Sequence, residues 1–154
     1  MITYKLSHGI NYNHTFSVLV FRHFIHLAYH PQLKHNIREI NKLLKNKRFI
    51  GIFAYNEKNK IIGYMLGSVD RLSDGRVSFF INYLYVCKKY RKNGIASEMI
   101  KLIKIKCNEI NVRYILLTCD TSDKKVYNFY LMRQFMPDQQ FRTYSRFDTM
   151  CANL

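Results

Sequence analysis

The sequence has few residues of the kinds that separate domains. It contains only two prolines and six glycines in 154 residues, and no stretch of small polar residues divides one half from the other. Repeats and low-complexity tracts are absent as well. Hydrophobic residues make up 48% of the chain, which is enough to fill one core. We therefore expect a single domain spanning residues 1–154.

Signs of secretion or membrane insertion are also missing. The N-terminus alternates like a strand and lacks the long apolar stretch of a signal peptide, and no apolar run is long enough to cross a bilayer. The cysteines form no C-x-x-C pair and lie in or beside apolar runs, as reduced thiols do. They are Cys87, Cys107, Cys119 and Cys151. These absences predict a cytoplasmic protein with no membrane partner.

Acidic residues are scarce. There are 10 Asp and Glu against 25 Lys and Arg, which gives a formal net charge of +15. A chain with this charge attracts polyanions from a distance. Three interpretations are a phosphate-rich cofactor, an acidic protein partner and nucleic acid. A fourth is compositional bias, in which most of the lysines simply solvate helix faces.

The spacing of apolar residues changes along the chain between helical and strand periods. A strand at the N-terminus is followed by helices at 12–29 and 33–44, separated by Pro31. Strands are predicted at 49–55, 61–67, 77–86, 114–119 and 140–150, and further helices at 94–110 and 124–135. The first three of these five strands are joined by short turns and should be antiparallel. The order predicts an α/β sheet with helices packed on its faces.

The junction of the strand at 77–86 with the next helix carries the clearest chemical signal. The chain passes through a basic turn into a helix that begins near Gly94 and Ala96. Unpaired N–H groups at a helix start and the positive end of the helix dipole form a site for phosphate. Gly94 lets the backbone approach an anion closely, and Ala96 leaves the first turn uncrowded.

This junction resembles the GCN5-related N-acetyltransferase (GNAT) superfamily, whose central motif Arg/Gln-x-x-Gly-x-Gly/Ala follows a Leu-Tyr-Val-like triplet. Arg91-x-x-Gly94-x-Ala96 and Leu84-Tyr85-Val86 match it. A second similarity is the Phe129-Tyr130 pair. In that segment Asp123 stands where the family has Asn, Val126 where it has Ala, and Gln134 where it has Gly. The resemblance covers residues 77–135.

The resemblance implies a fold, a cofactor and a mechanism. The fold is a mixed, mostly antiparallel sheet of about six to seven strands with about four helices on its faces, splayed between the fourth and fifth strands. The cofactor is acetyl-CoA, and an amine attacks its thioester directly. The residues that the resemblance places at the cofactor are Leu84, Tyr85, Val86, Arg91, Lys92, Asn93, Gly94, Ile95, Ala96, Ser97, Asp123, Tyr127 and Tyr130.

By resemblance, Tyr130 protonates the departing thiolate. Packing within an aromatic helix is the other interpretation of this tyrosine. The family often carries a Glu on the fourth strand as general base, but the comparable positions hold Ser78, Phe80 and Asn82. Asp120 is the substitute that we name, although an Asp just past a strand is usually a turn or cap residue.

Three histidines remain to be explained. His23, His26 and His30 could face one another and hold a metal, but their spacing is loose and no Cys or carboxylate joins them, so no metal site is predicted. Lining an acceptor groove is the alternative.

The acceptor is left open among a protein lysine or N-terminus, a small polyamine or aminoglycoside, and an aminoacyl-tRNA. The positive charge disfavours cationic small molecules and favours an acidic protein or tRNA-like acceptor. The competing hypothesis is a module that kept the fold, lost the chemistry and binds nucleic acid or an acidic protein. Either a monomer or a homodimer is expected.

Overall fold

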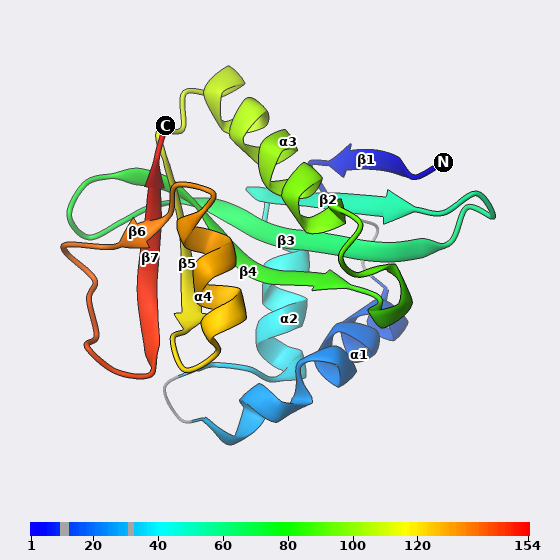
Figure 1. The fold of residues 1–154 in the computed structure, drawn as a ribbon, viewed down its shortest axis with the longest axis horizontal. Coiled ribbons are helices and arrows are strands. Elements are labelled where there is room, and N and C mark those ends of the chain that lie inside the picture. The colour runs from blue at the N-terminus through cyan, green and yellow to red at the C-terminus, as the bar shows by residue number, and fades with distance from the viewer. Residues whose placement is uncertain (10–12, 31–32) are drawn as a thin grey trace.

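The computed structural model describes residues 1–9, 13–30 and 33–154. Its described part holds one seven-stranded sheet with the strand order β1-β2-β3-β4-β5-β7-β6 (Figure 1). The strands are β1 (Thr3–Ser7), β2 (Phe49–Tyr55), β3 (Ile61–Arg71), β4 (Val77–Val86), β5 (Tyr114–Asp120), β6 (Met136–Pro137) and β7 (Phe147–Asn153). The α-helices are α1 (His14–His23), α2 (Ile37–Leu44), α3 (Ile95–Glu109) and α4 (Lys124–Leu131). Two short 3-10 helices, η1 (Ile25–Tyr29) and η2 (Lys88–Tyr90), complete the elements.

All neighbouring strands pair antiparallel except β4 and β5, which are parallel and connected through α3. This confirms the predicted mixed, mostly antiparallel sheet. The parallel pair requires a crossover, and α3 supplies it.

Two hydrophobic layers lie on opposite faces of the sheet. On one face, α3 and α4 pack over side chains such as Met65, Phe79 and Leu117. On the other face, Val20 of α1 and Ile40 of α2 pack over an aromatic layer from β2, β3 and β4. Figure 1 shows α3 and α4 in front of the sheet, with α2 passing behind it. Helices α3 and α4 therefore cover one face of the sheet, and α1 and α2 cover the other.

The first predicted helix is wrong in its length. It breaks at Phe24, and the chain continues as η1 instead of as α-helix. Apolar spacing of three and four residues suits both helix types, so the pattern did not separate them. In the structure the N-cap residue of α1 is Asn13, whose side chain accepts a hydrogen bond from the N–H of Thr15. The predicted start at Tyr12 and the break at Pro31 lie outside the described residues.

The C-terminal part differs from the prediction in three places. Helix α4 ends at Leu131, because Gln134 adopts a left-handed φ of 70° and the chain turns there, so a left-handed turn forms without the family's glycine. The short strand β6 was not predicted. The last strand begins at Phe147 instead of residue 140. Residues 140–146 form a loop, with N–H groups of Phe141 and Thr143 bonded to Asp138 and Asp148.

Candidate active site

The sheet opens between β4 and β5. The two strands pair only from Ser78 opposite Tyr114 to Ile81 opposite Leu117, and farther along β4 pairs with β3 alone. Asn82 is a bulge at this point, because Ile81 and Tyr83 are opposite the adjacent residues Gly67 and Leu66. A bulge bends its strand and increases the twist. The predicted splay between the fourth and fifth strands is thereby confirmed.

Backbone groups of β4 face this gap. The N–H of Cys87 donates to the carbonyl of Ile62 on β3, at 2.8 Å. Because alternate residues of a strand direct their hydrogen-bonding groups to opposite sides, those of Leu84 and Val86 are directed toward the gap. The carbonyl of Val86 accepts a 2.8 Å hydrogen bond from Nε of Arg91. The N–H groups of Leu84 and Val86 therefore offer two donors beside each other in the opening.

The start of α3 lies at the end of this gap. Gly94 is the N-cap residue with a left-handed φ of 76°, and no side chain caps the helix. Lys92 is also left-handed, with a φ of 64°. Ile95 is buried and anchors the loop, whereas residues 91–94 are exposed. The first N–H groups of α3 are thus available to an anion among three basic or amide side chains, Arg91, Lys92 and Asn93.

Helix α4 packs beside α3 on the same face of the sheet. The carboxylate of Asp123 accepts a hydrogen bond from the N–H of Val126, so it caps α4. Ser97, on the first turn of α3, accepts hydrogen bonds from the guanidinium of Arg133, which lies 3.6 Å from the ring centre of Phe129. Tyr127 packs against the core. Asp123 and Ser97 therefore have structural partners, and their predicted cofactor contacts stay predictions.

Tyr130 lies on α4 between two aromatic rings. Its ring centre is 5.2 Å from that of Phe129 and 5.6 Å from that of Phe135, both edge-on. Burial, with a smaller contribution from Cys119, raises the pKa of Tyr130 well above its ordinary value. The phenol is therefore protonated at neutral pH. Its hydroxyl has no hydrogen-bond partner within the described ranges, so it is free to donate to a ligand.

Asp120 is placed differently from the other candidate residues. Its two carboxylate oxygens accept hydrogen bonds from Arg146 at 3.0 and 2.8 Å, and one of them also accepts from the N–H and hydroxyl of Ser122. The Arg146 guanidinium, helped by Ser122, holds the pKa of Asp120 well below its usual range. A carboxylate in this state accepts protons poorly at neutral pH, and its contacts are those of a turn residue.

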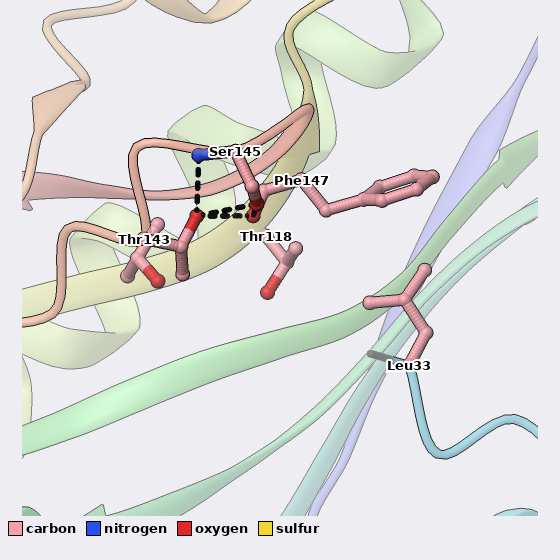
Figure 2. A pocket seen from close by; sticks show the side chains of 6 residues that line it. Leu33, Thr118, Thr143, Ser145 and Phe147 are labelled. Atoms are coloured by element: carbon pink, nitrogen blue, oxygen red, sulfur yellow. Dashed lines mark hydrogen bonds between the residues drawn. The ribbon is translucent and has the colours of Figure 1, made fainter. Parts of the chain in front are cut away.

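A pocket lies on the face of the sheet that carries α1 and α2. It has a volume of about 210 Å³ and is lined by Leu33, Thr118, Thr143, Ser145, Phe147 and Thr149 (Figure 2). The hydroxyl of Thr143 donates to the carbonyl of Phe147 at 2.7 Å and contacts the Ser145 hydroxyl. The lining is thus hydroxyl-rich with two apolar side chains. Sequence reasoning missed it because these residues come from three separate segments with no local pattern.

The three histidines of the first helical segment do not come together. His30 lies against the pocket residue Phe147, with ring centres 4.6 Å apart, and His26 is exposed. His23 stacks on Tyr85 at 3.7 Å. Across residues 1–9, 13–30 and 33–154, no group of three or more His, Cys, Asp or Glu side chains is arranged to hold a metal ion.

The gap between β4 and β5, the uncapped start of α3 and the protonated Tyr130 are the features that the resemblance predicts for a site that uses coenzyme A. A family model described as the acetyltransferase (GNAT) family matches residues 18–135. The chain belongs to this family, and it is an acyltransferase.

Solved structures with the same fold include complexes with CoA, with acetyl-CoA and with an aminoglycoside. The NatC complex bound to Gag peptide and CoA contains a chain with a TM-score of 0.72 and 19% identity, covering 99% of this chain and 98% of that one. NAA60 of Arabidopsis thaliana in complex with acetyl-CoA has a TM-score of 0.68 and 16% identity, covering 98% and 96%. An aminoglycoside acetyltransferase from an uncultured soil metagenomic sample, in complex with sisomicin, has a TM-score of 0.66 and 18% identity, covering 90% and 91%.

These identities show the fold and do not assign an acceptor. No curated protein matches the chain. The acetyl donor is acetyl-CoA, and the geometry fits it: an uncapped helix start for phosphate lies beside a gap lined with free N–H groups. No described helix has the length and apolar character needed to cross a membrane.

Proposed function

We propose that the chain is a single N-acetyltransferase domain, residues 1–154, that transfers acetyl directly from acetyl-CoA to a primary amine of an acidic acceptor. A protein N-terminus or lysine, or an aminoacyl-tRNA-like molecule, fits this description. The observation that carries the proposal is the opening of the sheet at Asn82. The helix start at Gly94 lies on one face of the sheet and the hydroxyl-rich pocket on the other, and in this proposal donor and acceptor meet through the opening. The four cysteines are free thiols, which supports a cytoplasmic location.

The proposed roles follow from the placement of each group. The N–H groups of residues 94–97 hold the pyrophosphate, and those of Leu84 and Val86 hold the pantetheine arm and polarise the thioester carbonyl. The amine attacks the carbonyl carbon, a C–N bond forms and the C–S bond breaks. The thiolate takes the proton of the Tyr130 hydroxyl, which solvent later restores, and the amine releases its proton to water.

The acceptor class is argued from the pocket. Its lining has four hydroxyl groups and no carboxylate. The nearby carboxylates Asp120 and Asp148 are paired with Arg146 and Arg142. A polycationic small molecule would find no free negative charge there and would be repelled by the +15 net charge. A peptide, with carbonyl and hydroxyl groups, finds partners for both.

The test combines cofactor binding with an acceptor library. Calorimetry should show acetyl-CoA binding to the protein, and thiol release should accelerate when peptides with acidic residues after a free N-terminus are added. Aminoglycosides and polyamines at equal concentration should give no acceleration. A salt-dependent acceptor KM would favour the tRNA-like class over short peptides. Absence of acetyl-CoA binding at millimolar concentration would refute the enzyme proposal.

A second function is supported by one observation. The strand positions where the family often carries its base hold Ser78, Phe80 and Asn82, and Asp120 is neutralised by Arg146. We therefore also consider a catalytically weak module that binds nucleic acid or an acidic protein. Acetyl-CoA binding without thiol release across the whole library, together with salt-sensitive binding of RNA, would favour this module over the enzyme.

A further inference from the structure

His23 is the last residue of α1 and lies directly on the strand that borders the gap. Its ring stacks on Tyr85 of β4 with a centre distance of 3.7 Å and an angle of 9°. Its Nδ1 atom is 2.7 Å from the hydroxyl oxygen of Tyr64 on β3. Two neighbouring strands therefore fix both the plane and the rotation of this imidazole.

The direction of the hydrogen bond with Tyr64 follows from burial. Tyr64 is 1% exposed, and burial, followed by Tyr85, Tyr83 and Cys87, raises its pKa far above the ordinary value. Its hydroxyl is therefore protonated, and His23 is its only hydrogen-bond partner in the described part of the chain. A buried hydroxyl hydrogen needs an acceptor. Tyr64 consequently donates to Nδ1, and the neutral ring of His23 carries its own hydrogen on Nε2.

Nε2 of His23 is an unused donor. It makes no hydrogen bond to any described residue, and it is not among the buried polar atoms that lack a partner, so it is open to solvent. Burial, and after it the positive charge of Arg91, lowers the pKa of His23 below its ordinary value. The groups that face the ring are Tyr64, Tyr85 and Arg91. At neutral pH the side chain thus presents a neutral, oriented N–H group.

The position of this donor indicates its ligand. The first turn of α3 and the acid Tyr130 on α4 belong to the opposite face of the sheet, whereas the guanidinium of Arg91 lies 5.7 Å from the centre of the Tyr85 ring. His23 belongs to the α1 and α2 face, next to the Tyr85 side chain and on the same side as the pocket. We propose that Nε2 of His23 donates a hydrogen bond to a carbonyl or carboxylate oxygen of the bound amine acceptor and so orients it at the gap. This inference rests on the proposed acetyl transfer.

Two substitutions separate the donor from the structural contact. In His23→Asn the side-chain oxygen replaces Nδ1 as the acceptor for Tyr64, and the Nε2 donor is lost. In His23→Gln the side-chain amide replaces the Nε2 donor, and the contact with Tyr64 is lost. We expect the acceptor KM to rise about tenfold in His23→Asn and about twofold in His23→Gln, with kcat and the acetyl-CoA Kd unchanged. The control His26→Asn, at an exposed position of η1, should match the wild type.

Several results would overturn the inference. An effect of equal size in the two variants, or one confined to His23→Gln, would assign His23 to the Tyr64 contact alone. A weaker acetyl-CoA Kd in His23→Asn would place the donor at a coenzyme oxygen near Arg91 instead of at the acceptor.

A measurement without acceptor tests the proposed His23 donor independently of the proposed acetyl transfer. Nitrogen NMR of the labelled, ligand-free protein at pH 8 should show His23 as the Nε2–H tautomer, and in Tyr64→Phe the tautomer preference should weaken. An Nδ1–H tautomer would overturn the assigned donor even if the enzyme is active. If no amine is acetylated while acetyl-CoA binds, the acetyl transfer proposal fails and the role of His23 in acceptor binding fails with it.

Discussion

The guanidinium of Arg76 binds the carboxylate of Asp138 through two parallel hydrogen bonds of 2.8 and 3.0 Å. Arg76 precedes β4, and Asp138 begins the loop at 138–146 that forms one wall of the pocket. The same guanidinium lies 5.2 Å from the ring centre of Tyr114 and 5.6 Å from that of Phe141. This pair therefore attaches the pocket loop to the sheet.

Asp138→Ala removes one partner of this pair and leaves Arg76 with Asp74 as its one carboxylate partner among the described residues. Because Asp138 is only 4% exposed, we expect the free energy of unfolding to fall by about 2–4 kcal/mol. Urea unfolding followed by circular dichroism measures this. Glu109→Ala breaks the exposed pair with Lys106 and should cost less than about 1 kcal/mol. Equal losses in the two variants would contradict the anchoring role.

The same carboxylates make stability depend on pH. Hydrogen bonds from Arg76 lower the pKa of Asp138, and those from Arg146 lower that of Asp120. A folded-state pKa below the unfolded value of 3.8 contributes stability that is present above pH 3.8 and is lost as the pH falls through the folded-state pKa. The melting temperature should therefore drop as the pH is lowered below about 4. Asp138→Asn should show a shallower drop, and a slope identical to that of the wild type would argue against the pair as its source.

Tyr130→Phe keeps the ring and removes the hydroxyl hydrogen. Because the phenol is the proposed acid, kcat should fall by about 100-fold while the acetyl-CoA Kd changes less than about twofold. Stopped-flow thiol release and calorimetry give the two numbers. Tyr29→Phe, at a tyrosine that is 83% exposed, is the control and should be unaffected. Full turnover in Tyr130→Phe would leave this ring with a packing role only.

Arg91→Lys tests the hydrogen bond to the Val86 carbonyl. A lysine keeps the charge but lacks the Nε group that reaches this oxygen at 2.8 Å. The loop before α3 should lose its fixed position, and acetyl-CoA should bind about five- to tenfold more weakly in calorimetry. Lys60→Ala removes a charge in the β2–β3 turn and should leave the Kd within about twofold. An acetyl-CoA Kd in Arg91→Lys within about twofold of the wild type would show that the hydrogen bond to the Val86 carbonyl does not position the loop.

Gly67→Ala tests the close contact of β3 with the bulged part of β4. A Cβ atom built on Gly67 would lie 2.2 Å from the carbonyl oxygen of Phe80, so β4 would have to move. We expect a loss of about 2–4 kcal/mol in the free energy of unfolding. Gly9→Ala, where nothing lies within 4 Å, should change stability by less than about 1 kcal/mol. Two equally stable proteins would show that the strand tolerates the displacement.

The parts of the candidate site that are formed by residues close together in the sequence could be predicted. The strand at 84–86, the turn and the helix start at Gly94 form one continuous segment, so the local pattern predicted the strand–turn–helix junction that we propose as the phosphate site. The splay followed from the resemblance, because the triplet and the helix matched together. The break after His23 was not predictable, since apolar spacing does not distinguish a 3-10 helix from an α-helix.

The contacts between distant residues could not be predicted. Tyr64 and His23 are 41 residues apart in the chain, and Arg76 and Asp138 are 62 apart. A single sequence holds no signal for such pairs. The pocket was missed for the same reason. Asp120 was named as a base because the fourth strand offers no carboxylate, and nothing in the sequence indicated its partner Arg146, which is 26 residues away. At Gln134 the sequence departs from the family's glycine, but the structure still forms the left-handed turn there.

The bulge at Asn82 has a consequence for how the two halves of the site are linked. Side chains alternate across a strand, so this one additional residue determines which face receives Tyr83 and Tyr85 and which receives Leu84 and Val86. Deleting Asn82 would exchange the two sets. The tyrosines would enter the layer beneath α3, and the surfaces proposed for acetyl-CoA and for the amine acceptor would both be lost. The number of residues in β4 therefore determines the side chains of the proposed donor site and of the proposed acceptor site at the same time.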